Sequence, residues 1–151
     1  MRPWPLVLNQ MSFGKRYVKL ILLRQKSTDS KVAVKAHRFT HDINNPALVL
    51  VHGLGSAGNI WKTLVPQLIE DFTVYAIDLP GHGDAPISHD EEMDPRSLAQ
   101  SIVNYMVSEM GVERMHVAGN SLGGWIALEM AAVAPDHVLS VTALAPAGLW
   151  H

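Results

Sequence analysis

The sequence of 151 residues contains no cysteine, which excludes a disulfide scaffold, a thiol nucleophile and any metal site built on cysteine. It also has no apolar run near the roughly 18 residues that a membrane-spanning helix needs. Apolar runs such as Leu20–Leu23 and Ala47–Val51 have the length of single strands. A net charge of −2 gives the chain no overall basic field, so no nucleic-acid partner is expected. With 48% apolar and 17% charged residues, the composition is that of a globular domain.

The first 26 residues contain basic side chains and no acidic one. A basic, acid-poor start is found in transit-type and membrane-surface segments. It lacks the long apolar stretch of a secretory signal, and we interpret residues 1–30 as a basic N-terminal extension. Its second half, Tyr17–Leu23, is expected to add an edge strand. A cytoplasmic location is expected, with a transit-type segment as the alternative. The basic residues are Arg2, Lys15, Arg16, Lys19, Arg24 and Lys26.

From Lys31 onward, short apolar runs alternate with segments of helical length, a pattern typical of an α/β sheet. We therefore predict a mostly parallel, doubly wound sheet with flanking helices. Strands are expected at Val32–Phe39, Ala47–His52, Phe72–Asp78, Arg114–Gly119 and Val138–Ala145. Helices are expected at Asn59–Glu70, from a cap at Asp94 to Gly111, and at Leu122–Ala134, where Pro135 follows.

One strand-to-helix junction carries the pattern G-x-S-x-G, in residues 119–123. This pattern is the nucleophile elbow, a tight turn that raises a serine hydroxyl above the sheet edge. Gly119 and Gly123 supply the required absence of side chains, with Asn120 between the first glycine and the serine. Ser121 is the predicted nucleophile, and the following helix adds a dipole that favours developing negative charge.

A second informative loop, His52-Gly53-Leu54-Gly55, directly follows a buried strand. In a serine acyl-transfer site, one oxyanion N–H comes from the residue after the nucleophile, here Leu122. A second N–H comes from the loop after an earlier strand, most plausibly that of Leu54. His52 is expected to brace this loop rather than act as the base.

The same loop also matches the dinucleotide-binding pattern G-x-G-x-x-G over residues 53–58, with Asp78 at the end of the next strand. The residues after the third glycine, 59–62, are not small, as a helix closely packed on the sheet would require. Asp78 is also followed by a second glycine-rich loop containing His82, which a ribose-binding role does not need. We therefore expect no dinucleotide site, and we assign no metal ligands.

The segments HGLG, DLPGHG and GNSLGG, in this order and at these distances, resemble the α/β-hydrolase family. The resemblance covers about residues 31–150. It implies a sheet of about eight strands when complete, Ser121 as nucleophile, Leu54 and Leu122 as oxyanion donors, and no cofactor. Residues 31–151 then correspond to the amino-terminal part of such a domain, ending after about the sixth strand. A serine nucleophile separates the chain from the aspartate branches of the family, the haloalkane dehalogenases and epoxide hydrolases.

The resemblance implies hydrolysis of a small-molecule ester, with carboxylesterases as the main interpretation. GNSLGG followed by residues 145–149 (APAGL) is similar to C–C bond hydrolases of ring-cleavage products, which stay an alternative. The family's acid and histidine follow later strands, and no residue here matches them. His137 is expected at the wrong end of the sheet, His151 is not at the family's histidine position, and Asp78 lacks a histidine to orient.

We therefore expect the chain alone to be nearly inactive. A non-catalytic fragment or pseudo-hydrolase that only binds is the competing class. The last strand, Val138–Ala145, would be an exposed apolar edge that favours self-association.

Overall fold

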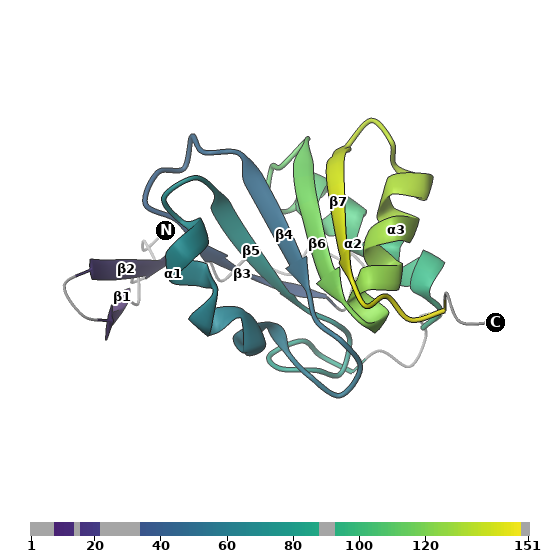
Figure 1. Ribbon diagram of the computed structural model, residues 1–151, viewed down its shortest axis with the longest axis horizontal. Helices are drawn as coiled ribbons and strands as arrows, with labels where there is room; N and C mark the ends of the chain where they lie inside the picture. Colours follow the sequence, from purple (N-terminus) through teal and green to yellow (C-terminus); the bar gives the residue numbers. More distant parts are fainter. Residues whose placement is uncertain (1–7, 14–15, 22–33, 88–92, 149–151) are drawn as a thin grey trace, which may run out of the picture.

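The computed structural model describes residues 8–13, 16–21, 34–87 and 93–148. In the described part, seven strands form one sheet in the order β1-β2-β3-β5-β4-β6-β7 (Figure 1). The strands are β1 Leu8–Phe13, β2 Arg16–Ile21, β3 Lys35–Phe39, β4 Ala47–Val51, β5 Thr73–Asp78, β6 Met115–Asn120 and β7 Val138–Leu144.

The sheet has a parallel part and an antiparallel part. Strands β5, β4, β6 and β7 pair in parallel, whereas β1, β2 and β3 join the β5 side through antiparallel pairs. The predicted α/β sheet with flanking helices is confirmed. The expected strand Tyr17–Leu23 corresponds to β2, but it is not the edge, because β1 pairs along its outer side. Whether residues 1–30 form a separate extension stays a prediction.

Helices cover both faces of the sheet (Figure 1). On one face, the core includes Ile102 and Met106 of α2, Ile126 of α3, and Val49 of the sheet. On the other face, Trp61 and Val65 pack against strands β4 and β5. The sheet is therefore doubly wound, as predicted. The helices are η1 Gly58–Thr63, which is a 3₁₀ helix, α1 Val65–Leu68, α2 Pro95–Ser108 and α3 Leu122–Val133.

The ends of α2 follow the residues that were expected to set them. The Asp94 carboxylate accepts the backbone N–H groups of Arg96 and Ser97 at 3.0 and 3.2 Å, and Pro95 occupies the first turn. The expected helix over Asn59–Glu70 is wrong in detail, because it divides into η1 and α1. Pro66 explains the division, since it cannot donate a backbone N–H to the preceding turn.

The candidate site lies where the parallel strands β4, β5 and β6 end. Each strand runs into one of the glycine-rich loops, so the topology brings the three loops to one edge of the sheet. Within the described residues, no helix is both long and apolar enough to cross a membrane.

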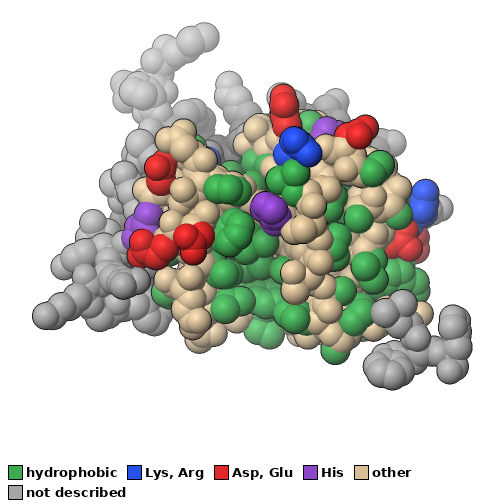
Figure 2. Space-filling model, turned by 45° about the horizontal axis from the view of Figure 1, so that its top comes forward, with side chains coloured by type: hydrophobic (Ala, Val, Ile, Leu, Met, Phe, Trp, Pro, Cys, Tyr) green, Lys and Arg blue, Asp and Glu red, His purple; other side chains and the backbone are tan. Residues whose placement is uncertain are grey.

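Strand β7 is an edge of the sheet among the described strands, because only β6 pairs with it. Leu139 and Leu144 are 42% and 43% exposed. On the side of the molecule drawn in Figure 2, hydrophobic side chains form a broad area and acidic side chains lie towards its margins. The predicted apolar edge is therefore present, whereas its pairing with another chain stays a prediction.

Candidate active site

Ser121 has the backbone conformation of a nucleophile elbow. It lies between β6 and α3 with φ 54° and ψ −116°, in the left-handed half of φ space that non-glycine residues avoid. A Cβ on Gly119 would overlap the carbonyl group of Gly123. A Cβ on Gly123 would overlap the Val51 carbonyl group and lie 2.6 Å from the His52 carbonyl oxygen. The two flanking glycines are therefore required by sterics, as the sequence predicted.

Hydrogen bonds from the end of β7 hold this strained residue. The Ser121 N–H donates to the Leu144 carbonyl oxygen at 3.0 Å, and the Ser121 carbonyl accepts the Ala147 N–H at 2.9 Å. Ala145, between these partners, has the other positive φ found in a described non-glycine residue, 43°. The Asn120 side chain donates a long bond of 3.5 Å to the same Leu144 carbonyl. Residues with a strained backbone, such as Ser121 and Ala145, keep it only where many surrounding contacts hold them in place.

The loop after β4 lies directly against the elbow. A Cβ built on Gly53 would lie 3.3 Å from the Ser121 Cβ, so Gly53 gives the two loops room to touch. Leu54, the next residue, is 78% exposed. Leu122 opens α3, where the first N–H groups of a helix have no partner within it. These placements favour the Leu54 and Leu122 amides as oxyanion donors, while their convergence on one point stays a prediction.

The contacts of His52 are those expected of a brace rather than of a base. It is fully buried, and its Nε2 accepts the Leu79 N–H at 3.1 Å. Its Nδ1 therefore carries the proton and donates to the Gly53 carbonyl at 2.7 Å. Burial lowers the pKa of His52, which favours the neutral ring. Both ring nitrogens are thus engaged in holding the ends of β4 and β5 together.

Asp78 ties three segments of the chain together. Its side chain, 2% exposed, accepts the N–H of Gly58 at 2.6 Å and that of Asp84 at 2.9 Å. The His37 Nε2 lies 2.7 Å from the second carboxylate oxygen. Burial alone would raise the pKa of Asp78, but the His37 bond and the two backbone bonds outweigh it and lower the pKa to about 2.

The expectation that Asp78 has no histidine to orient is wrong. His37 lies on β3, and sequence reasoning missed it because its partner becomes visible only through the antiparallel register of β3 and β5. His37 is not a substitute for the missing base. In the sheet order, β3 is three strands from β6, or roughly 14 Å at the usual strand spacing.

His37, Asp78 and Asp84 also place three potential metal-ligand atoms within 4.8 Å of one another. Both Asp78 oxygens already accept hydrogen bonds from the protein. The Lys35 ammonium lies 3.9 Å from the Asp84 carboxylate and partly balances its charge. The group is fully explained as a hydrogen-bonded cluster, so it does not point to a metal.

His82 links the second and first loops. Its Nδ1 lies 2.9 Å from the Pro80 carbonyl, and its Nε2 accepts a long bond of 3.4 Å from the Gly55 N–H. Its ring centroid lies 5.2 Å from that of His52. The supporting role predicted for His82 agrees with these contacts.

Within the described residues, no histidine is hydrogen-bonded to the Ser121 hydroxyl. The His116 Nδ1 lies 2.8 Å from the Ser140 hydroxyl, and the His137 Nδ1 lies 2.6 Å from the Glu113 carbonyl. His137 precedes β7 and therefore lies at the opposite end of the sheet from Ser121. His151 lies outside the described residues. The described segments hold a serine elbow and its supporting loops, but no base in contact with them.

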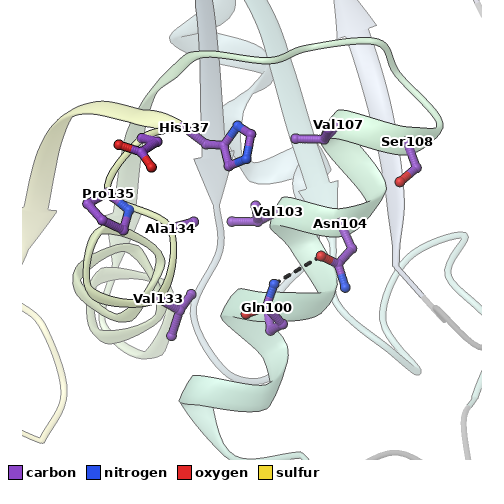
Figure 3. A pocket seen from close by; sticks show the side chains of 10 residues that line it. Gln100, Val103, Asn104, Val107, Ser108, Val133, Ala134, Pro135 and His137 are labelled. Carbon is purple, nitrogen blue, oxygen red and sulfur yellow. Dashed lines mark hydrogen bonds between the residues drawn. The ribbon is translucent and has the colours of Figure 1, made fainter.

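A hollow of about 300 Å³ lies between α2 and α3 near His137 (Figure 3). Its wall includes Gln100 and Asn104, whose side chains are hydrogen-bonded at 2.9 Å. It adjoins the C-terminal end of α3, whereas Ser121 is at the N-terminal end. Twelve helical residues separate the two by roughly 18 Å. The hollow is therefore not part of the Ser121 site.

Comparisons with known proteins agree with this geometry. The model of the family described as alpha/beta hydrolase fold matches residues 46–151. A solved structure titled as a membrane phospholipase A superposes with a TM-score of 0.72 at 35% identity, covering 78% of this chain and 38% of that one. A structure titled as a marine microorganism esterase has a TM-score of 0.65 at 25% identity, with coverages of 73% and 40%.

Among curated proteins, a pimeloyl-[acyl-carrier protein] methyl ester esterase of Methylococcus capsulatus is 41% identical over 99 residues, which are 66% of this chain and 36% of that protein. The acetyltransferase component of an acetoin cleaving system of Pseudomonas putida is 36% identical over 102 residues, 68% of this chain and 27% of that protein. The chain thus spans about a third of the curated relatives it matches.

Proposed function

Because the chain belongs to the alpha/beta-hydrolase fold family, we propose that it carries the nucleophile half of an ester hydrolase site, with Ser121 as nucleophile. The observation that carries this proposal is the positive φ of Ser121 at the junction of β6 and α3, with Gly53 against it. A serine held in this way lies next to a loop whose backbone N–H groups can face a substrate.

The proposed chemistry is acyl transfer to water. The Ser121 oxygen attacks the ester carbonyl carbon, and the Leu54 and Leu122 N–H groups stabilise the resulting oxyanion. The bond to the alcohol then breaks, and water hydrolyses the acyl-serine. A histidine must accept the serine proton and return it to the alcohol. No described residue supplies that histidine, so we propose that the 151-residue chain alone is nearly inactive.

The substrate class rests on the relatives. Two of them are an esterase of a methyl ester and an esterase of marine origin by their names. We therefore propose an ester as substrate, in keeping with the small-molecule ester expected from the sequence. The cytoplasmic location expected from the sequence stays a proposal. The competing proposal is a protein that binds without cleaving.

The test is turnover of p-nitrophenyl acetate by the chain, with Ser121→Ala as control. In a serine triad, loss of the histidine costs about 10⁶-fold in turnover, so the two proteins should differ by only about tenfold or less. Strong turnover that disappears in the control would show that the chain contains a base, and would overturn the proposed inactivity. Strong turnover unchanged in the control would overturn Ser121 as the nucleophile.

A further inference from the structure

The loop Gly53–Gly58 is fastened to the end of β5 at three points. His52 binds the Gly53 carbonyl at the start of the loop and the Leu79 N–H beyond β5. His82 accepts the Gly55 N–H at 3.4 Å near the middle. Asp78 accepts the Gly58 N–H at the end of the loop, and this bond of 2.6 Å is shorter than the bond of 3.4 Å from Gly55 to His82.

Asp78 contacts this loop closely through its negatively charged carboxylate. A Cβ on Gly58 would lie 3.1 Å from the Asp78 Oδ1, and a Cβ on Gly83 would overlap the carboxylate itself. The two glycines thus let the backbone close around the carboxylate. A hydrogen bond to an ionised acceptor is about twice as strong as a neutral one. The end of the loop is therefore held by a charged group that solvent hardly reaches.

His37 holds that carboxylate from the opposite side. It lies on β3, two residues from Lys35, which pairs with Asp78 in the antiparallel register. Residues two apart in a strand lie on one face, so the two side chains can meet. The His37 Nε2 is 2.7 Å from Oδ2, which also accepts the Asp84 N–H. The carboxylate thus has donors on both oxygens.

We propose that His37 and Asp78 form a positioning pair that fixes the loop Gly53–Gly58, and with it the Leu54 N–H, beside Ser121. The inference rests on the proposed function, since it assigns the loop to oxyanion binding. Neither residue touches the reacting atoms in this account. The pair acts through Gly58, and its effect reaches Leu54 along four residues of backbone.

The discriminating variant is Asp78→Asn, because a carboxamide offers one acceptor oxygen where the carboxylate offers two. The amide oxygen is expected at the Oδ2 position, where both the Asp84 N–H and His37 donate, so the Gly58 N–H loses its acceptor. The matched control is Asp94→Asn. The Arg96 and Ser97 N–H groups both donate to one oxygen of Asp94, and asparagine caps a helix about as well as aspartate.

The readout is amide hydrogen exchange followed by NMR on the full chain. Asp78→Asn should speed exchange at Gly55 and Gly58 about tenfold or more, while the amides of α3 and β4 stay within about twofold. The Gly58 amide proton should also move upfield as its short bond to a charge is lost. Asp94→Asn should leave the loop unchanged. Exchange at Gly58 within twofold of the parent in folded Asp78→Asn would overturn the proposal.

If Asp78→Asn does not fold, His37 provides the test. His37→Ala removes one donor from the carboxylate and should speed exchange in the loop by several-fold. His37→Gln, which can still donate, should restore much of the protection. Equal loop exchange in the parent and His37→Ala would contradict the role of the pair. None of these measurements requires turnover, so a failure of the proposed function would be visible separately, as absence of acylation at Ser121.

Discussion

The backbone N–H of Ser121 donates to the carbonyl oxygen of Leu144 at 3.0 Å, which connects the elbow to the end of the neighbouring strand. The Ser121 carbonyl in turn accepts the N–H of Ala147, three residues further on. The strained serine is thus clamped from both sides by one segment. Backbone strain of about 1–3 kcal/mol persists only where such contacts outweigh it. The position of the candidate nucleophile therefore depends on β7 as much as on its own motif.

Gly123→Ala should destabilise the chain by about 3 kcal/mol, because its Cβ would overlap the backbone of Val51 in the packed sheet. Gly111→Ala is the matched control. Gly111 has φ 67° and nothing within 4 Å of an added Cβ, so only backbone strain of about 1 kcal/mol applies. Urea unfolding measures both free energies. Equal losses in the two variants would show that close packing at the elbow is not what requires glycine.

Asp78 should make the free energy of unfolding depend on pH in the acidic range. Its pKa is lowered from 3.8 to about 2 in the folded chain, so its stabilisation is complete above the unfolded pKa and lost as the pH falls through the folded one. The difference in unfolding free energy between the parent and Asp78→Asn should shrink by about 1–2 kcal/mol between pH 5 and pH 2. A difference that stays constant over that range would contradict the lowered pKa.

The exposed edge of β7 should support self-association. Leu139→Lys places a charge on this strand, where the leucine is 42% exposed, and should lower the dimer fraction about tenfold. Ile43→Lys, at a residue that is 62% exposed and lies before β4, is the control and should leave association unchanged. Sedimentation velocity measures the fractions. A monomeric parent chain, or equal effects of both substitutions, would exclude β7 as the contact.

The sequence predicted those features that depend on residues close together along the chain. Asp94, Pro95 and the glycines around Ser121 act on their own neighbours, so their roles follow from the local sequence. The contact between His37 and Asp78 does not, because it depends on the register of two strands 41 residues apart. The helix expected over Asn59–Glu70 divides near Pro66. This proline is visible in the sequence, but the helical pattern of the residues around it led us to expect one continuous helix.

The other features of the candidate site depend on the order in which the strands pair in the sheet. The elbow and the loop after β4 touch because β4 pairs with β6, although about 70 residues separate Gly53 from Ser121. In the sequence, only the resemblance of the ordered motifs to a known family indicated that these two loops lie together. The pairing of β4 with β6 is the physical reason for it. The partners of Ser121 at Leu144 and Ala147 had no sequence signal, since backbone groups of any residue type can make these bonds.

The central claim, that Ser121 is the nucleophile, is tested most directly by locating the acetyl group after a single exposure of the chain to p-nitrophenyl acetate. Peptide mass spectrometry of the parent, Ser121→Ala and Ser140→Ala measures the adduct at each position. Ser140 is the matched control, because its hydroxyl lies 2.8 Å from the His116 Nδ1 without an elbow around it. We expect acetylation of Ser121 at least about tenfold above that of Ser140, because the proposed oxyanion site acts even without a base. Acetylation of Ser140 equal to or above that of Ser121 would contradict it.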